Sequence, residues 1–263
     1  MGAVIGGCYA AGQLEATAEW ARSLTRRRML GYLDVSLAGS GLINGTRLAR
    51  QLEKTIGKVK IEELDVQFAA VATEIETGHE VWLTRGRLLE ALRASYALPG
   101  VFPPVRIGGR WLLDGALVNP VPVSAARALD ARLVIGVNIN SDLLGRGTTI
   151  HSHGFDDDEP PVGAAGDGGW RARRRAEKLL RRKLFGEAGR PGLSTVMIDA
   201  YTVMQDRITR ARLAGDPADI MIGPRLGDIG MFDFHRAEEA IKIGAEAAER
   251  SLDQIEQALK VLA

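Results

Sequence analysis

The stretch that decides the fold is RASYALPGVFPPVRIGGRWLLDGALVNPVP, residues 93–122. Towards its end stand Asp114, Gly115 and Ala116, with apolar residues on both sides. Asp-Gly between apolar runs is first of all typical of a hairpin turn, because both residues tolerate a positive φ. A turn alone does not need the prolines at positions 99, 103, 104, 120 and 122, which fix how the chain enters and leaves it. The pattern therefore indicates one carboxylate held between a rigid approach and a rigid exit.

This run resembles the second signature of the patatin-like phospholipases, a family of serine acyl hydrolases. The family pattern is Arg-Ala-Ser-x-Ala-x-Pro-Gly-x-Phe-x-Pro, a strand into Asp-Gly-Gly or Asp-Gly-Ala, and a turn built on Asn and Pro. The chain matches it at 93–104, 112–116 and 119–122. By this resemblance Asp114 is the catalytic acid/base of a Ser-Asp dyad without histidine, and Gly115 and Ala116 complete its motif. The implied fold is an α/β, patatin-like three-layer sandwich, with a mostly parallel central sheet and helices on both faces.

The first twelve residues, MGAVIGGCYAAG, resemble the helix that follows the nucleophile of the same family. In patatin-like proteins the serine stands in Gly-x-Ser-x-Gly, on a sharp turn between a strand and a helix. Met1 and Gly2 match the last two residues of that turn, so the resemblance places the serine immediately before Met1. The family's glycine-rich oxyanion loop has no match in the 263 residues. We therefore expect a chain that starts just after the nucleophile and lacks the first strands of the fold.

Three other residues could carry a catalytic role, and each has a structural alternative. Cys8 falls two turns into the expected first helix, where a small buried thiol is the favoured interpretation. Ser95 belongs to the Arg-Ala-Ser of the family signature, which resembles a structural position beside the site. His235 falls at the start of a helix that the family uses structurally. The sequence therefore favours a structural role for all three.

Periodicity and turn residues predict the elements around the site. A helix is expected over 46–56, with Thr46 as its N-cap. Val66–Ile75 and Leu133–Ile139 are apolar, as buried strands are. Further expected elements are a Thr77-Gly78 turn, a short strand over Glu80–Thr84, a helix over Arg85–Tyr96 and a Gly108-Gly109 hairpin turn.

Composition excludes several classes of protein. The chain has 34 Lys and Arg against 33 Asp and Glu, so it has no excess positive charge that would attract nucleic acid. Nucleic acid is therefore not expected as a partner. The single cysteine, Cys8, excludes an internal disulfide framework and fits a reducing compartment. A length of 263 residues fits a single domain, 1–263. Because neither a membrane-spanning run nor a basic N-terminal region is present, we expect a cytoplasmic protein, and no cofactor is predicted.

Residues 141–186 differ from the rest of the chain. Residues 141–169 combine many Gly, Pro and acidic residues without periodicity, so they are expected to form a mobile acidic loop. Its His151 and His153 could bind a metal, but a metal site is not predicted. Residues 170–186 are expected to form a basic helix with an apolar stripe. Two interpretations compete: peripheral contact with an anionic membrane through 170–185, or a solvated face, which the sequence favours.

Ester hydrolysis needs a nucleophile, a base for its proton, and donors for the developing oxyanion. A carboxylate with an ordinary pKa of about 3.9 is a weak base, and an apolar setting raises that pKa. The expected function is hydrolysis of a lipid or other acyl ester by a Ser-Asp dyad. Because the serine and the oxyanion loop are missing, the chain as written is expected to be inactive. The alternative is a catalytically dead member that binds lipid or a protein partner.

Overall fold

The computed structural model describes residues 1–32, 34, 41, 43–141, 193–227, 229–230 and 233–262. The chain divides into two compact units. The large unit comprises Met1–Leu143 with Gln205–Ala263, and the second comprises Leu144–Met204. Of the second unit, 193–204 are described, as the first part of helix α8 (Leu193–Gly215). A single domain over 1–263 stays a prediction.

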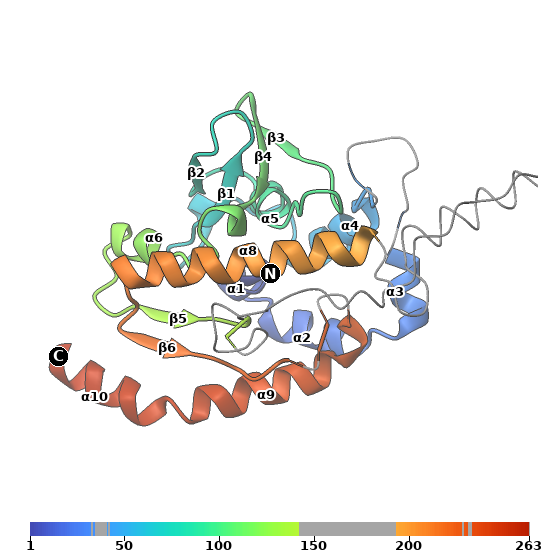
Figure 1. Ribbon diagram of the computed structural model, residues 1–263. Helices are drawn as coiled ribbons and strands as arrows, with labels where there is room; N and C mark the ends of the chain where they lie inside the picture. The colour runs from blue at the N-terminus through green and yellow to red at the C-terminus, as the bar shows by residue number, and fades with distance from the viewer. Residues whose placement is uncertain are drawn as a thin grey trace, which may run out of the picture. The chain divides into compact units, whose positions relative to one another are not determined.

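Four strands of the large unit form one sheet in the order β2-β1-β4-β3, seen at the top of Figure 1. The strands are β1 (Ala70–Glu74), β2 (Glu80–Leu83), β3 (Val105–Ile107) and β4 (Arg110–Asp114). All three pairings are antiparallel. The turn between β1 and β2 passes through Gly78 at φ 70°, and Gly108 and Gly109 at φ 57° and 84° join β3 to β4. Two consecutive residues with positive φ suit a tight hairpin, as the sequence predicts at this point.

The α/β class is confirmed, but the expectation of a mostly parallel central sheet is wrong for the described residues. Strands joined by a few turn residues can only run antiparallel, since a parallel neighbour needs a long crossover. Parallel pairing occurs between β5 (Ile135–Val137) and β6 (Ile220–Ile222), which form a separate two-stranded sheet. Leu133–Ile139 was expected to be a buried strand, yet Ile135 and Val137 are 40% and 54% exposed. The two side chains point to the same face of β5, and this face is partly open to solvent.

Helices account for most of the remaining described chain. The α-helices of the large unit are α1 (Gly2–Ala10), α2 (Leu14–Arg22), α3 (Arg26–Tyr32), α4 (Thr46–Ile56), α5 (Leu88–Ser95), α6 (Val123–Ala128), α9 (Ala237–Glu249) and α10 (Leu252–Leu262). Short 3₁₀ turns are η1 (Ile61–Glu63), η2 (Gly115–Leu117) and η3 (Phe234–Arg236). Within the described part of the chain, no helix is both long and apolar enough to span a bilayer.

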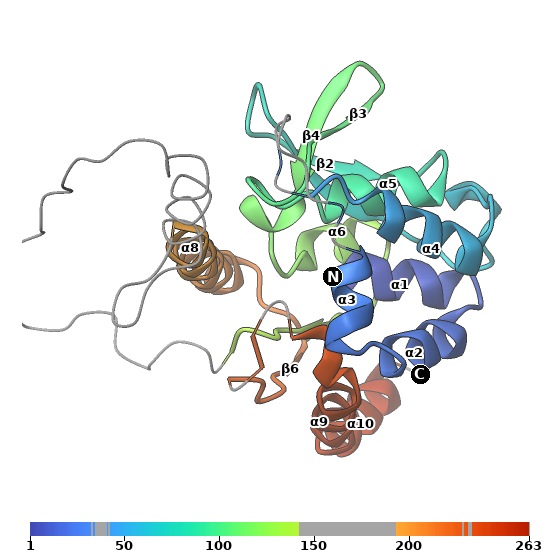
Figure 2. The ribbon, with the colours of Figure 1, turned by 90° about the vertical axis from the view of Figure 1, so that its right-hand side faces the viewer.

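The core of the large unit lies between the four-stranded sheet and α5. Leu88 and Leu92 of α5 and Leu112 of β4 are essentially fully buried there. Helix α1 packs on the other side of α5, and Figure 2 shows α5, α1, α2 and α9 following one another away from the sheet. A Cβ added to Gly7 would lie 2.9 Å from Leu92 Cδ2, so the small residues of α1 permit this close packing.

Several predicted elements occur with small shifts of their ends. The helix over 46–56 is confirmed as α4, but the assignment of Thr46 as its N-cap is wrong. Gly45 occupies the cap, and the Asp34 carboxylate accepts hydrogen bonds from the Gly45 and Thr46 N–H groups at 2.9 and 3.0 Å. An acid from an earlier segment therefore supplies the capping oxygens. The expected strand over Val66–Ile75 shortens to β1, which is buried as predicted from Ala70 to Thr73.

Candidate active site

Asp114 is the last residue of β4 and the N-cap of η2, and its backbone is bonded on both sides. Its N–H donates to the Ala97 carbonyl oxygen at 3.0 Å, which ties it to the proline-rich segment before β3. Its carbonyl oxygen accepts from the buried Thr73 hydroxyl at 2.9 Å. One carboxylate oxygen, Oδ1, accepts from the Ala116 N–H, also at 2.9 Å. These bonds fix the position of the backbone and restrain the direction of the half-buried carboxylate.

Gly115 allows the neighbouring strand to approach the site. A Cβ at this position would lie 2.3 Å from the carbonyl oxygen of Val71 and 2.5 Å from its carbonyl carbon. Any side chain would therefore collide with the backbone of β1, the strand paired with β4. The absence of a side chain at Gly115 therefore allows the β1 backbone to lie directly against the residue that follows Asp114. Ala116, the third motif residue, contributes the N–H that orients the carboxylate.

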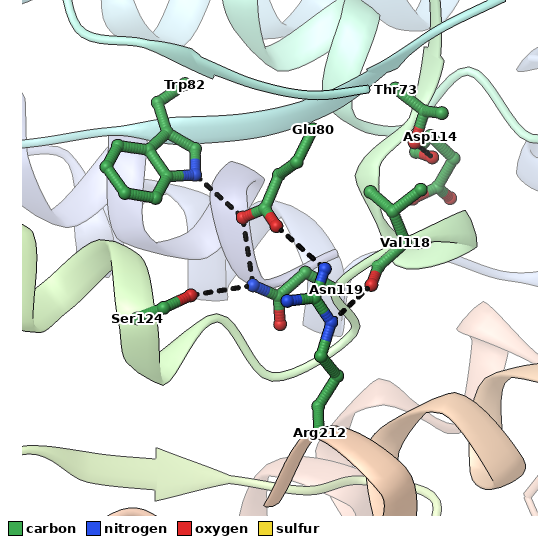
Figure 3. A network of polar contacts seen from close by, with 8 residues as sticks. All are labelled: Thr73, Glu80, Trp82, Asp114, Val118, Asn119, Ser124 and Arg212. Carbon is green, nitrogen blue, oxygen red and sulfur yellow. Dashed lines mark hydrogen bonds and ion pairs between the residues drawn. The ribbon is translucent and has the colours of Figure 1, made fainter. Parts of the chain in front are cut away.

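The residues after η2 are held by a polar network, shown in Figure 3. The Asn119 side-chain amide donates to Glu80 Oε1 at 2.9 Å and to the Ser124 hydroxyl at 3.1 Å. The Trp82 indole N–H donates to the same Glu80 oxygen at 2.7 Å. Arg212 of α8 donates through Nε to the Val118 carbonyl oxygen at 3.1 Å and through Nη2 to Glu80 Oε2 at 3.2 Å. Strand β2, the turn after Asp114 and α8 therefore meet at one carboxylate.

A hollow of about 280 Å³ adjoins this network. It is lined by Asn119, Val121, Val123, Ser124, Ala211, Arg212, Gly215 and Asp216. Sequence reasoning included Asn119 as part of the quoted motif but missed Glu80 and Arg212. Neither residue carries a local signal, because their partners lie far away in the sequence.

Met1 and Gly2 begin α1, at the point marked N in Figures 1 and 2. The Met1 carbonyl oxygen accepts from the Ile5 N–H at 3.2 Å, so the first turn of this helix is formed. Both α1 and the η2 turn after Asp114 contact the same two elements, β1 and α5. Helix α1, at the start of the chain, and the turn that follows Asp114 therefore pack against the same two elements.

Comparison with known proteins gives a consistent result. A family model described as patatin-like phospholipase matches residues 1–127, which include Asp114. An NTE family protein of Mycobacterium tuberculosis, called uncharacterized in its name, is 32% identical over 298 residues, covering 97% of this chain and 82% of that protein. The chain belongs to the patatin-like phospholipase family.

Longer proteins of related name share the same region. A second NTE family protein of Mycobacterium tuberculosis is 30% identical over 220 residues, 83% of this chain but 34% of that protein. Lysophospholipase NTE1 of Pyricularia oryzae is 26% identical over 214 residues, 81% of this chain and 13% of that protein. The patatin-like chain thus matches only a part of each of these two relatives.

The alternative catalytic residues of this patatin-like chain lie in structural settings. Cys8 is fully buried, and this burial raises the pKa of its thiol, while a hydrogen bond with Thr17 acts in the opposite direction. The expected burial of Cys8 is confirmed, and a thiol that resists ionisation is a poor nucleophile. Ser95 ends α5, two residues before the Ala97 carbonyl that binds Asp114. His235 lies in η3, where its Nε2 accepts from Arg26 of α3 at 3.2 Å.

Two further points from the sequence concern metal binding and the basic helix. Within the described residues, no group of three or more His, Cys, Asp or Glu is arranged to hold a metal ion. His151 and His153, the acidic loop over 141–169 and the basic helix over 170–186 lie outside the described residues, apart from Ser141. The mobile loop and the basic helix stay predictions.

Proposed function

We propose that this chain is the acid/base-bearing part of a lipid acyl ester hydrolase, with Asp114 as the base of a Ser-Asp dyad. Membership of the patatin-like phospholipase family supports lipid hydrolysis, and one relative is named a lysophospholipase. The observation that carries the assignment of Asp114 is the set of hydrogen bonds that fix this residue in place. Its N–H, its carbonyl oxygen and its carboxylate each have a hydrogen-bond partner from a different segment. A catalytic base must be held in a fixed direction, and this one is.

In the proposed reaction, a serine hydroxyl attacks the ester carbonyl carbon while the Asp114 carboxylate takes the hydroxyl proton. Backbone N–H donors stabilise the resulting oxyanion. The bond to the alcohol then breaks, and Asp114 returns the proton to the leaving oxygen. Water then attacks the acyl-serine while Asp114 takes one of its protons, and Asp114 gives this proton to the serine oxygen as the acyl bond breaks, which releases the fatty acid and restores the serine hydroxyl. The proposal takes this serine to be the residue immediately before Met1, on the resemblance of Met1 and Gly2 to the end of the family's nucleophile turn.

The proposal is tested by comparing residues 1–263 with a form extended by the codons upstream of Met1, on a p-nitrophenyl ester and a lysophospholipid. We expect the extended form to release product and the 263-residue chain to match buffer. In the extended form, Asp114→Asn should lower kcat by about 10²–10⁴-fold, the usual contribution of a general base. Asn keeps the shape of the side chain but cannot take the serine proton.

Asp130→Asn is the matched control, because Asp130 is an exposed aspartate that belongs neither to the Asp114 motif nor to the polar network, and Asn tolerates its φ of 62°. It should leave kcat unchanged. Activity of the 263-residue chain that survives Asp114→Asn would refute the dyad. An extended form that binds lysophospholipid without cleaving it would instead support the catalytically dead alternative.

The location of the protein and its partners remain part of the proposal. We propose a cytoplasmic protein that uses no nucleic acid partner and that meets its lipid substrate at a membrane surface. Residues 170–185 are the segment proposed to contact anionic lipid, on the basis of their basic sequence. The competing interpretation, a solvated basic face, predicts no salt-dependent lipid binding.

A further inference from the structure

We infer that Glu80 and Arg212 are positioning residues for Asp114: they hold the far end of the turn that begins at this aspartate. The inference rests on the proposed function, in which Asp114 is the base. The near end of the turn needs no such help, because Asp114 is paired with Ala72 of β1 and bonded to the Thr73 hydroxyl. The far end lies beyond the sheet and is held by side chains.

The turn itself is weakly held from within. It is one 3₁₀ turn, in which the Val118 and Asn119 N–H groups both donate to the Gly115 carbonyl oxygen, at 3.1 and 2.9 Å. A single such turn has poor hydrogen-bond geometry and little stability of its own. Its shape therefore depends on what holds residues 118 and 119 from outside. A rotation of the turn would carry the Ala116 N–H with it, and this N–H orients the Asp114 carboxylate.

Glu80 is the anchor of the far end. Its side chain is only 15% exposed and accepts from Trp82 of its own strand, from Asn119 of the turn and from Arg212 of α8. A mostly buried carboxylate is costly unless donors and an opposite charge surround it. The carboxylate therefore fixes the position of each donor. Asn119, itself 4% exposed, also donates a hydrogen bond to the Ser124 hydroxyl. Figure 3 shows this convergence on Glu80.

Arg212 connects the turn to a second element. Its Nε donates to the Val118 carbonyl oxygen while Nη2 pairs with Glu80, so one guanidinium bridges the turn and the anchor. The arginine side chain is 48% exposed, and ion pairs of this exposure contribute little to global stability. Loss of Arg212 should therefore loosen the turn without unfolding the protein. This separation distinguishes a positioning role from a structural one.

The test uses Arg212→Met, which removes both donors, and Arg212→Lys, which keeps the charge for Glu80. The control is Arg87→Met, which breaks an ion pair of similar exposure, Arg87 with Glu53 at 2.7 Å, on α4 and the start of α5. In the extended, ester-cleaving form we expect Arg212→Met to lower kcat about 10–100-fold, since a displacement near 1 Å can cost that much. KM should stay within about twofold, Arg212→Lys should recover part of kcat, and Arg87→Met should change neither.

Amide hydrogen exchange and a pH titration provide readouts that do not require turnover. The Val118 and Asn119 amides should exchange about tenfold faster in Arg212→Met and unchanged in Arg87→Met. The chemical shift of the Ala116 amide should follow Asp114 titration in wild type and lose amplitude in Arg212→Met. Unchanged exchange and titration in Arg212→Met would overturn the inference. If the unsubstituted extended form cleaves no ester, the proposed function fails, and these two measurements still decide whether Arg212 positions the carboxylate.

Discussion

Replacing Gly115 by alanine tests how closely β1 must approach the site. The added Cβ would lie 2.3 Å from the Val71 carbonyl oxygen and 2.9 Å from its Cγ1. Favourable contact between non-bonded heavy atoms occurs near 3.5–4.0 Å, so the strand and the turn would have to separate by about 1 Å. The conformation of Gly115 is not the cause of the expected effect, because its φ is not positive.

The size of the effect follows from which atoms must move. Overpacking a core costs about 1–3 kcal/mol, and more when the obstacle cannot rotate away. Here the obstacle is the backbone of β1, which is fixed between β2 and β4. We therefore expect Gly115→Ala to lower the free energy of unfolding by about 3 kcal/mol or more. That is a large part of the roughly 5–15 kcal/mol that stabilises a typical domain.

Urea unfolding followed by circular dichroism measures this loss. Gly244→Ala is the matched control: Gly244 lies inside α9, and an added Cβ would meet no heavy atom within 4 Å. Alanine there should stabilise the helix by about 0.5–1 kcal/mol. A Gly115→Ala protein within about 0.5 kcal/mol of wild type would refute the close approach of the two backbones. Equal destabilisation by both variants would point to a general intolerance of substitution.

Three further predictions use other parts of the chain. Iodoacetamide should modify Cys8 on the order of 100-fold more slowly than in urea, because the thiol is buried and its pKa is raised; fast labelling of the folded protein would contradict this. The hydrogen bond from the Val134 N–H lowers the pKa of the Asp219 carboxyl below its ordinary value. The ionised carboxylate therefore stabilises the folded protein above about pH 4, and this stabilisation is lost as the pH falls. Below that pH the melting temperature of Asp219→Asn should fall less steeply than that of wild type. Binding to anionic liposomes should disappear when Gln replaces Arg173, Arg174, Arg181 and Arg182, whereas unchanged binding would favour a solvated face.

Local chemistry in the sequence was a good guide to local structure. The Gly108-Gly109 pair predicts a hairpin, and the two residues adopt the positive φ angles that a tight turn needs. The same pair argues for antiparallel neighbours, whereas resemblance to the family suggested a mostly parallel sheet. Turn chemistry decides the β1–β2 and β3–β4 pairings, since their short connections leave no room for a crossover.

Contacts between distant segments could not be predicted in this way. The capping acid of α4 is Asp34, whereas propensity rules pointed to Thr46 because they consider only adjacent residues. Glu80 and Arg212 are 132 positions apart, and neither stands in a recognisable motif. Asp114 could be singled out because its restraints, the prolines and Gly115, are close to it in the sequence.

The residues that fix Asp114 and its turn therefore come from two ranges of the sequence. Its backbone partners Thr73 and Ala97, and the Ala116 N–H, all lie within residues 1–127, the range that the family model matches. The far end of its turn also depends on Arg212, which lies beyond that range on α8. A carboxylate that must point in one direction needs both ends of its turn fixed, because either end alone leaves a rotation open. The matched range thus contains the proposed base, while its orientation also depends on α8.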